Sequence, residues 1–205
     1  MLNINSRNKL IILVSTFAAL TAVGAYLKIP LPHIPITLQT FFVIMSGNLL
    51  GFKFGTLSQF LYLIVGLLGI PVFANGGGPG YIFQPTFGYL LGYPFCALAI
   101  GILIKLFVTN LNEWLKSKVK IFFIFFISDL MGVVVIFSFG LAYLFINLKL
   151  GLYMKLEQVA VSNLNWGNLV KTTLFLFIPI DIIKAFFASW LMIPLQKVAI
   201  LPAEG

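Results

Sequence analysis

Charged residues are scarce in this sequence. Of its 205 residues only 9% are Asp, Glu, Lys or Arg, whereas 60% are hydrophobic. Soluble domains carry about 25% charged residues, so this chain lacks the side chains needed to cover a water-facing surface. The apolar runs are long and do not alternate with polar residues at every second position, as the strands of a membrane barrel do. The composition therefore predicts an all-α integral membrane protein.

Cysteine and histidine are almost absent. The chain has one of each, Cys96 and His33, and only five acidic residues. A lone cysteine excludes an internal disulfide framework and a CxxC metal pair, and no His/Cys/Asp/Glu cluster offers a metal site. The net charge of +8 fits basic residues retained at cytoplasmic helix ends better than a nucleic-acid-binding surface. We expect no metal, no cofactor and no nucleic-acid partner.

Long apolar runs are what the sequence does contain. A membrane-spanning helix needs about 20 apolar residues, and six candidates are found at 10–29, 35–52, 54–70, 84–107, 121–147 and 174–195. The second and third are short and separated only by "GFKFG", which predicts a tight helical hairpin. The polar segment 148–171 is expected to lie along the membrane surface. We expect one membrane domain, residues 1–205.

The basic residues predict the orientation. With six spans and a cytoplasmic amino terminus, eight basic residues fall inside and four outside, which favours cytoplasmic N and C termini. The inner group is Arg7, Lys9, Lys53, Lys105, Lys116, Lys118, Lys120 and Lys197, and the outer group is Lys28, Lys149, Lys155 and Lys171. The loop 27–35, the glycine-dense stretch that follows the third span and the start of the last span then share the outer face.

The stretch "GIPVFANGGGPGYIFQPTFGYLLGY", residues 69–93, is uncharged and rich in glycine and aromatic residues. Glycines such as Gly76 and Gly77 let the backbone approach a ligand closely. The aromatic residues that could supply apolar walls are Phe73, Tyr81, Phe83 and Tyr89. A pocket that is mostly apolar with a few directed polar groups is typical of a small-molecule site.

Two acidic residues and one basic residue lie inside predicted spans, where a charge costs about 2.5–3.5 kcal/mol. Asp181 and Lys184, in "FIPIDIIKAFF", are three residues apart and so share one helix face. Pro179 predicts that the tightly wound part of this span starts there. The pair either binds a ligand or forms an internal ion pair that only neutralises itself. For Asp129 the alternatives are a carboxylate near the interface or one bonded to a neighbouring helix.

The chemistry of these side chains suits a neutral cyclic urea. Asp181 offers acceptors, Lys184 offers donors and Asn75 offers both, whereas a cyclic urea has two N–H donors beside one carbonyl. Catalysis is not expected. The acidic residues read "SDL" and "IDI" rather than Gly-Asp, and "NGGGPG" lacks the Lys-Ser/Thr of a phosphate loop.

Three strings carry a resemblance to a known family: "FAALTAVGAYLKIPLPHIPITLQTFFVIMSGNLLG", "GTLSQFLYLIVGLLGIPVFANGGGPGYIFQPTFGYLLGY" and "FIPIDIIKA". They resemble the BioY-type biotin transporters, the substrate-binding S-components of energy-coupling-factor (ECF) transporters. The similarity covers about 15–105 and 176–190. "ITLQT", "LGIPVFA" and "IPxDxIKA" are its specific parts.

The resemblance implies a six-helix S-component bundle in the cell membrane that binds biotin with high affinity on the outer side. It implies docking onto a transmembrane T-component and two cytoplasmic ATPases, which hydrolyse the ATP. Residues matching Asn75, Asp181 and Lys184 would hold the ureido ring. Ala18 and Ala22 would form the docking surface, since small side chains let helices approach closely in lipid, although ordinary internal packing would also use them.

This sequence departs from the family pattern in "QPTFGY", with Gln84 and Phe87 where the family has Gly-Pro-Thr-Gly-Gly-Tyr. It also has no arginine on the outer side, since Arg7 is its only one. The remaining donors for a carboxylate are Tyr89, the N–H groups of 76–78, Lys28 and His33, and the sequence does not choose among them. The alternatives to a biotin S-component are an S-component or carrier for another small vitamin, and a subunit without a ligand.

Overall fold

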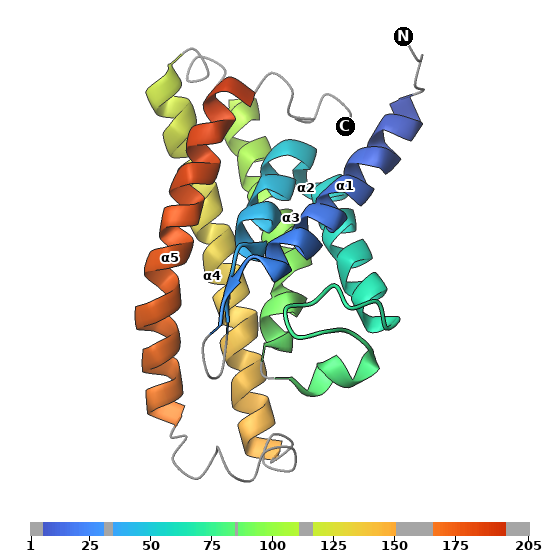
Figure 1. The fold of residues 1–205 in the computed structure, drawn as a ribbon. Helices are drawn as coiled ribbons and strands as arrows, with labels where there is room; N and C mark the ends of the chain where they lie inside the picture. Colours follow the sequence, from blue (N-terminus) through green and yellow to red (C-terminus); the bar gives the residue numbers. More distant parts are fainter. Residues whose placement is uncertain (1–5, 31–34, 85, 111–116, 151–165, 196–205) are drawn as a thin grey trace.

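The computed structural model describes residues 6–30, 35–84, 86–110, 117–150 and 166–195 (Figure 1). In chain order the elements are α1 (Ser6–Tyr26), β1 (Lys28–Ile29), β2 (Ile36–Thr37), α2 (Gln39–Leu67), the 3-10 helix η1 (Pro79–Phe83), α3 (Phe87–Asn110), α4 (Lys118–Leu150) and α5 (Trp166–Leu195). Within these residues, five helices are long and apolar enough to cross a membrane. Helices satisfy all their backbone hydrogen bonds internally, as lipid requires. The described residues are mostly helical, as the sequence predicts, with one short two-stranded sheet in addition.

The second and third predicted spans form one element, α2, that folds back on itself at Gly51. This glycine has φ 71° and ψ −174°, a backbone conformation that other residues rarely adopt. Gln59 Nε2 lies 3.1 Å from Ser46 Oγ, 13 residues earlier, whereas 13 residues of straight helix span about 20 Å. The predicted hairpin is therefore present. The count of six separate helices is not confirmed, because a single glycine makes the reversal and no loop separates the limbs.

The limbs of α2 are short for a bilayer. Residues 39–50 and 52–67 extend for about 18 Å and 24 Å at 1.5 Å per residue, against a hydrocarbon core of about 30 Å. The tip of the hairpin rests on α3 at Gly101, where an added Cβ would lie 2.1 Å from the Phe52 backbone nitrogen. A glycine is required there for the limbs and α3 to pack.

The chain crosses the bundle repeatedly (Figure 1). α1 descends in this view, the limbs of α2 rise and descend, α3 rises, α4 descends and α5 rises. The first residues of α1 and the last of α5 therefore lie at the same end of the bundle. This agrees with termini on one side of a membrane. Their assignment to the cytoplasm stays a prediction.

The core lies between α2, α3, α4 and α5. Its largest fully buried apolar side chains include Ile44, Ile100, Phe125 and Met192. The outward faces are apolar as well, with exposed side chains at Ile12, Leu57, Phe123, Phe175 and Trp190. A protein that is apolar inside and outside is suited to lipid rather than water.

The start of the last helix differs most from the prediction. α5 begins at Trp166, and Pro179 lies inside it rather than at the start of its tightly wound part. Pro94 similarly lies inside α3, because neighbouring groups in membrane helices re-satisfy the backbone that a proline frees. Most of the segment predicted to lie on the membrane surface, 151–165, is outside the described residues.

Candidate substrate-binding site

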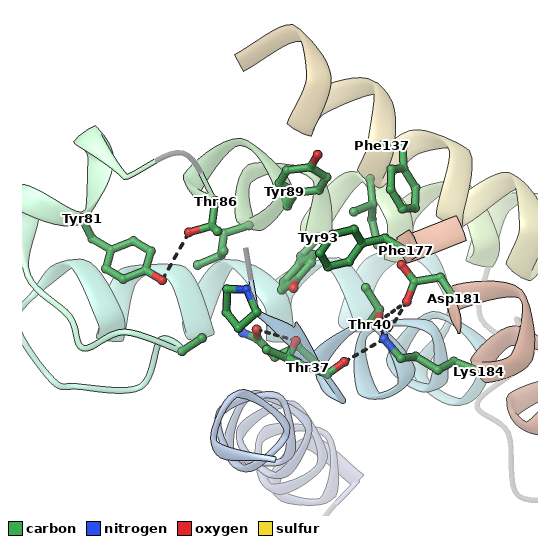
Figure 2. A pocket seen from close by; sticks show the side chains of 15 residues that line it. Thr37, Thr40, Tyr81, Thr86, Tyr89, Tyr93, Phe137, Phe177, Asp181 and Lys184 are labelled. Carbon is green, nitrogen blue, oxygen red and sulfur yellow. Dashed lines mark hydrogen bonds and ion pairs between the residues drawn. The ribbon is translucent and has the colours of Figure 1, made fainter. Parts of the chain in front are cut away.

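A pocket lies at the meeting point of β2, α2, α3, α4, α5 and the segment before η1 (Figure 2). Its lining combines apolar and aromatic side chains with a few polar groups, which is the composition typical of small-molecule sites. The lining residues are Pro35, Thr37, Gln39, Thr40, Ala74, Tyr81, Thr86, Tyr89, Leu90, Tyr93, Ile136, Phe137, Phe177, Asp181 and Lys184. Figure 2 shows the charged pair at one end, Tyr81 and Thr86 at the other, and aromatic rings between.

Asp181 and Lys184 form an ion pair on one face of α5. Lys184 Nζ lies 2.6 Å from Asp181 Oδ1, and their side chains are 11% and 8% exposed. Lys184 also donates to the Thr37 carbonyl oxygen at 2.7 Å and to Thr40 Oγ1 at 2.8 Å. Thr40 in turn donates to Asp181 Oδ1 at 2.8 Å. The pair is thus joined to the start of α2 and to β2.

The hydrogen-bonding capacity of this cluster is unevenly used. A lysine ammonium has three donors, and the three partners of Lys184 account for all of them. Both bonds to Asp181 end on Oδ1. Oδ2 receives none within the described part of the chain, so this carboxylate oxygen is the acceptor offered to a ligand.

The short antiparallel pairing of β1 with β2 positions Thr37, whose carbonyl oxygen accepts from Lys184. β1 and β2 pair with Lys28 opposite Thr37 and Ile29 opposite Ile36, which fixes the backbone at the entry to α2. Thr37 Oγ1 then donates to Gln39 Oε1 at 2.9 Å. Gln39 Nε2 donates to Tyr62 Oη at 2.5 Å, and Tyr62 Oη donates to the Val72 carbonyl oxygen at 3.1 Å. This chain of hydrogen bonds connects the pocket to the glycine-dense loop.

The glycine-dense loop turns at Gly69, Gly76 and Gly78, which have φ values of 106°, 116° and 101°. Gly77 is required for another reason, because a Cβ there would lie 2.2 Å from the Ile70 carbonyl oxygen. Phe73 is buried between Tyr62 and Tyr81, with ring centroids at 5.4 and 4.6 Å. The loop is thereby folded back against α2.

Tyr81 occupies the end of the pocket away from the ion pair. Its hydroxyl oxygen lies 3.4 Å from Thr86 Oγ1. Burial raises the pKa of Tyr81 above its ordinary value, although hydrogen bonds from Thr86 and from the Asn75 backbone partly offset this. Tyr81 therefore stays a neutral hydroxyl group at physiological pH.

The structure brings together only part of the predicted set. Asp181, Lys184, Tyr81 and Tyr89 line the pocket. The remaining predicted residues lie in the loop beside it and are not among the lining residues: Phe73, Asn75, Gly76, Gly77 and Phe83. Their direct role in binding stays a prediction.

Asn75 is exposed, and its Oδ1 accepts a hydrogen bond from Lys28 at 3.3 Å. Lys28 also donates to the carbonyl oxygen of Ala74, which does line the pocket. Of the other donors considered for a carboxylate, His33 lies outside the described residues.

The residues missed from the sequence come mainly from "ITLQT" and the aromatic helix faces. Thr37, Gln39 and Thr40 place hydrogen-bonding groups at one wall, and Tyr93, Phe137 and Phe177 add rings. Three polar residues at the entry to an apolar helix, one in β2 and two in the first turn of α2, were the available signal, because each needs a partner in a membrane.

The two alanines predicted to form the docking surface, Ala18 and Ala22, are not both exposed on α1. Ala18 is buried in the chain's own core at 8% exposure, and Ala22 is half-buried. The neighbouring Ala19 is the exposed small residue on this helix turn. A docking role for Ala18 and Ala22 stays a prediction.

Asp129 is fully buried in α4 and bonded to two other helices. Its Oδ2 lies 3.3 Å from Asn48 Nδ2 on α2 and 2.7 Å from Ser189 Oγ on α5. The alternative of bonding to a neighbouring helix is therefore the correct one. Asp129 does not line the pocket.

The sequence is similar to those of several known proteins. A family model described as the BioY family matches residues 2–200. A "Probable biotin transporter BioY" of Lysinibacillus sphaericus is 43% identical over 145 residues, which is 71% of this chain and 69% of the relative. The "Biotin transporter BioY" of Thermotoga maritima is 36% identical over 156 residues, covering 76% of this chain and 84% of that protein.

One solved structure has a similar fold. It is a crystal structure described as "the S-component for biotin from an ECF-type ABC transporter", with 28% sequence identity and a TM-score of 0.71. The alignment covers 96% of this chain and 95% of that one.

Proposed function

The chain belongs to the BioY family, and we propose that it is the membrane subunit that binds biotin for uptake through an ECF-type transporter. BioY is a family of transport proteins and not of enzymes. The observation that carries the proposal is the ion pair of Asp181 and Lys184, which leaves one carboxylate oxygen without a partner among the described residues, inside a largely apolar pocket.

Biotin has chemical features that match this pocket. Its ureido ring carries two N–H donors, and Asp181 Oδ2 is an acceptor with no other partner in the described residues. The apolar part of the vitamin suits the walls formed by Tyr89, Tyr93 and Phe137, since such sites combine apolar walls with few polar anchors. Charge-assisted hydrogen bonds to a carboxylate are about twice as strong as neutral ones, which supports tight binding.

The partners follow from the same proposal. The protein is a multi-pass membrane protein, and we place it in the cell membrane. Its transport activity would require a transmembrane T-component and two cytoplasmic ATPases. The chain itself would need no cofactor. The exposed side of α1 that includes Ala19 offers a small-residue surface for the T-component, with Ala22 at its edge.

Equilibrium binding of labelled biotin to the purified full chain in detergent tests the proposal. We expect saturable binding that excess unlabelled biotin displaces. Other small vitamins, among them thiamine and riboflavin, should not compete. A folded protein that binds one of these and not biotin would make the chain an S-component for that vitamin. A folded protein that binds none would contradict a ligand-binding role.

A further inference from the structure

A second buried polar cluster lies deeper in the bundle than the pocket. It consists of Asn48 on α2, Asp129 on α4 and Ser189 on α5, and all three residues are 0% exposed. Asp129 Oδ2 accepts from Asn48 Nδ2 at 3.3 Å and from Ser189 Oγ at 2.7 Å. None of the three residues lines the pocket.

The cluster lies at the same distance from the binding site along α2 as along α5. Thr40 of α2 contacts Asp181 of α5, and Asn48 and Ser189 each follow eight residues later on the same helices. Eight residues of helix correspond to about 12 Å. α2 and α5 are thus connected at two levels by polar side chains, with a carboxylate at each level.

The two carboxylates differ in whether a positively charged side chain lies beside them. Asp181 has Lys184 at 2.6 Å, whereas no charged side chain acts on Asp129 in the part of the chain that the structure describes. The titratable group facing it from α3 is the thiol of Cys96, which is uncharged and also buried. An ionised carboxylate buried without a cation is too costly to persist, and such a group becomes neutral instead.

Two oxygen atoms of the cluster indicate what neutralises the Asp129 carboxylate. Asn48 Oδ1 and Asp129 Oδ1 are both buried acceptors that find no hydrogen-bond partner among the residues the structure describes. Ca²⁺ binds six to eight oxygen ligands, and Mg²⁺ demands an octahedral set, whereas this cluster has two unpaired side-chain oxygens. A proton needs only two, because a protonated carboxyl group has one O–H donor.

We propose that Asp129 is a proton-binding site and holds a neutral carboxylic acid whose Oδ1–H donates to Asn48 Oδ1. The proton comes from solvent and converts the carboxylate to the acid, with no other bond changed. The acid and the amide then form two opposed hydrogen bonds, since Asn48 Nδ2 already donates to Asp129 Oδ2. Both unpaired acceptors are satisfied, and α2, α4 and α5 are joined without a fixed charge.

Infrared spectroscopy of the full chain in lipid membranes tests this proposal. The sequence contains only five acidic side chains, so a protonated carboxyl band can be assigned by substitution. We expect the wild-type protein at pH 7 to show this band, with a shift in deuterated water. Asp129→Asn should remove the band, and Asp181→Asn should leave it. Absence of the band, or its removal by Asp181→Asn alone, would overturn the proposal.

A serine pair supplies a second test if Asp129→Asn does not fold. Ser189→Ala removes the hydroxyl that lies 2.7 Å from Asp129 Oδ2 and 2.7 Å from the Ala185 carbonyl oxygen, and it should shift the band. Ser128→Ala removes an equally buried hydroxyl that donates to Ile124 of its own helix and should leave the band unchanged. Equal spectra for both variants would contradict the assignment. The melting temperature of the wild type should be the same in sodium and choline chloride, and a rise with sodium would indicate a metal ion in place of the proton.

Discussion

Asp181 and Lys184 lie one turn apart on α5, with Lys184 Nζ at 2.6 Å from Asp181 Oδ1, yet both depend on residues more than 140 positions earlier. Thr40 bonds to each of them at 2.8 Å, and the Thr37 carbonyl oxygen accepts from Lys184 at 2.7 Å. This arrangement uses every donor of the lysine and leaves one oxygen of the aspartate. The cation therefore orients the carboxylate, and the carboxylate is the group available to a ligand.

Asp181→Asn should weaken biotin binding about 10- to 150-fold, the equivalent of about 1.5–3 kcal/mol for a hydrogen bond to a charged group. Lys184→Met should instead lower stability by about 3–5 kcal/mol, because it leaves Asp181 buried without its partner. Binding isotherms and thermal unfolding of the purified variants separate the two effects. Unchanged affinity in Asp181→Asn would move the ligand to another part of the pocket.

Thr40 provides a finer test of the same cluster. Thr40→Val keeps the shape of the side chain but removes its bonds to Asp181 and Lys184, so it should cost about 1 kcal/mol of biotin affinity. Thr40→Ser retains the hydroxyl group and should bind within about twofold of the wild type. Equal affinities for the two variants would show that the hydroxyl group does not support the site.

Lys28 is predicted to attract the carboxylate of biotin. It is bonded to the Ala74 carbonyl oxygen and to Asn75 Oδ1 at the edge of the pocket. Lys28→Met should weaken the binding of biotin about tenfold and leave the binding of biotin methyl ester, which is neutral, unchanged. Competition binding with both compounds checks this. A parallel loss for both compounds would mean that Lys28 acts only on the loop.

Gly77→Ala should distort the loop that borders the pocket. The added Cβ would lie 2.2 Å from the Ile70 carbonyl oxygen, so the backbone must shift, at a cost of about 1–3 kcal/mol. Gly80→Ala is the matched control, because nothing lies within 4 Å of its added Cβ and its φ is not positive. Biotin affinity and melting temperature should fall only for Gly77→Ala. A similar fall for Gly80→Ala would point to a general intolerance of the loop.

The protonation of Tyr81 predicts a loss of stability in alkaline solution. Burial raises the pKa of Tyr81 above its ordinary value of about 10. The stabilisation of the neutral form is therefore complete below about pH 10 and is lost as the pH rises through the folded-state pKa. Between pH 9 and 11 the melting temperature of Tyr81→Phe should fall less than that of the wild type. Parallel curves would contradict the prediction.

The orientation in the membrane can be read with introduced cysteines. The natural Cys96 is 0% exposed, so it should give little background with a membrane-impermeant maleimide. On intact cells Gly80→Cys should be labelled, and Lys118→Cys should be labelled only after the cells are opened. The reverse pattern would place the termini outside.

Hydropathy was sufficient to locate the helices, because every span must be a long apolar run. It predicted the hairpin of α2 but not that Gly51 alone makes the reversal, since "GFKFG" looks like a short connector between two spans. The reversal depends on contacts such as Gln59 with Ser46 and on the missing side chain at Gly101.

The charged part of the site was predictable and the neutral part was not. Asp181 and Lys184 stand out because a charge within a span needs a reason. Thr37 and Thr40 are uncharged and give a weaker signal, and their role depends on how α2 packs beside α5. Asn75 was chosen for its chemistry. The side-chain direction in a glycine-dense loop is set by local turns, and here Asn75 Oδ1 accepts from Lys28, so its role in binding stays a prediction.

The 141 residues that separate Thr40 from Asp181 also determine when the site comes into being during synthesis. At about 5–20 residues per second, the ribosome adds Asp181 on the order of ten seconds after Thr40. Until the last helix enters the bilayer, the threonine wall has no carboxylate beside it. Under the proposed role of Asp181, a newly made molecule can therefore capture the vitamin only after its last helix has entered the bilayer.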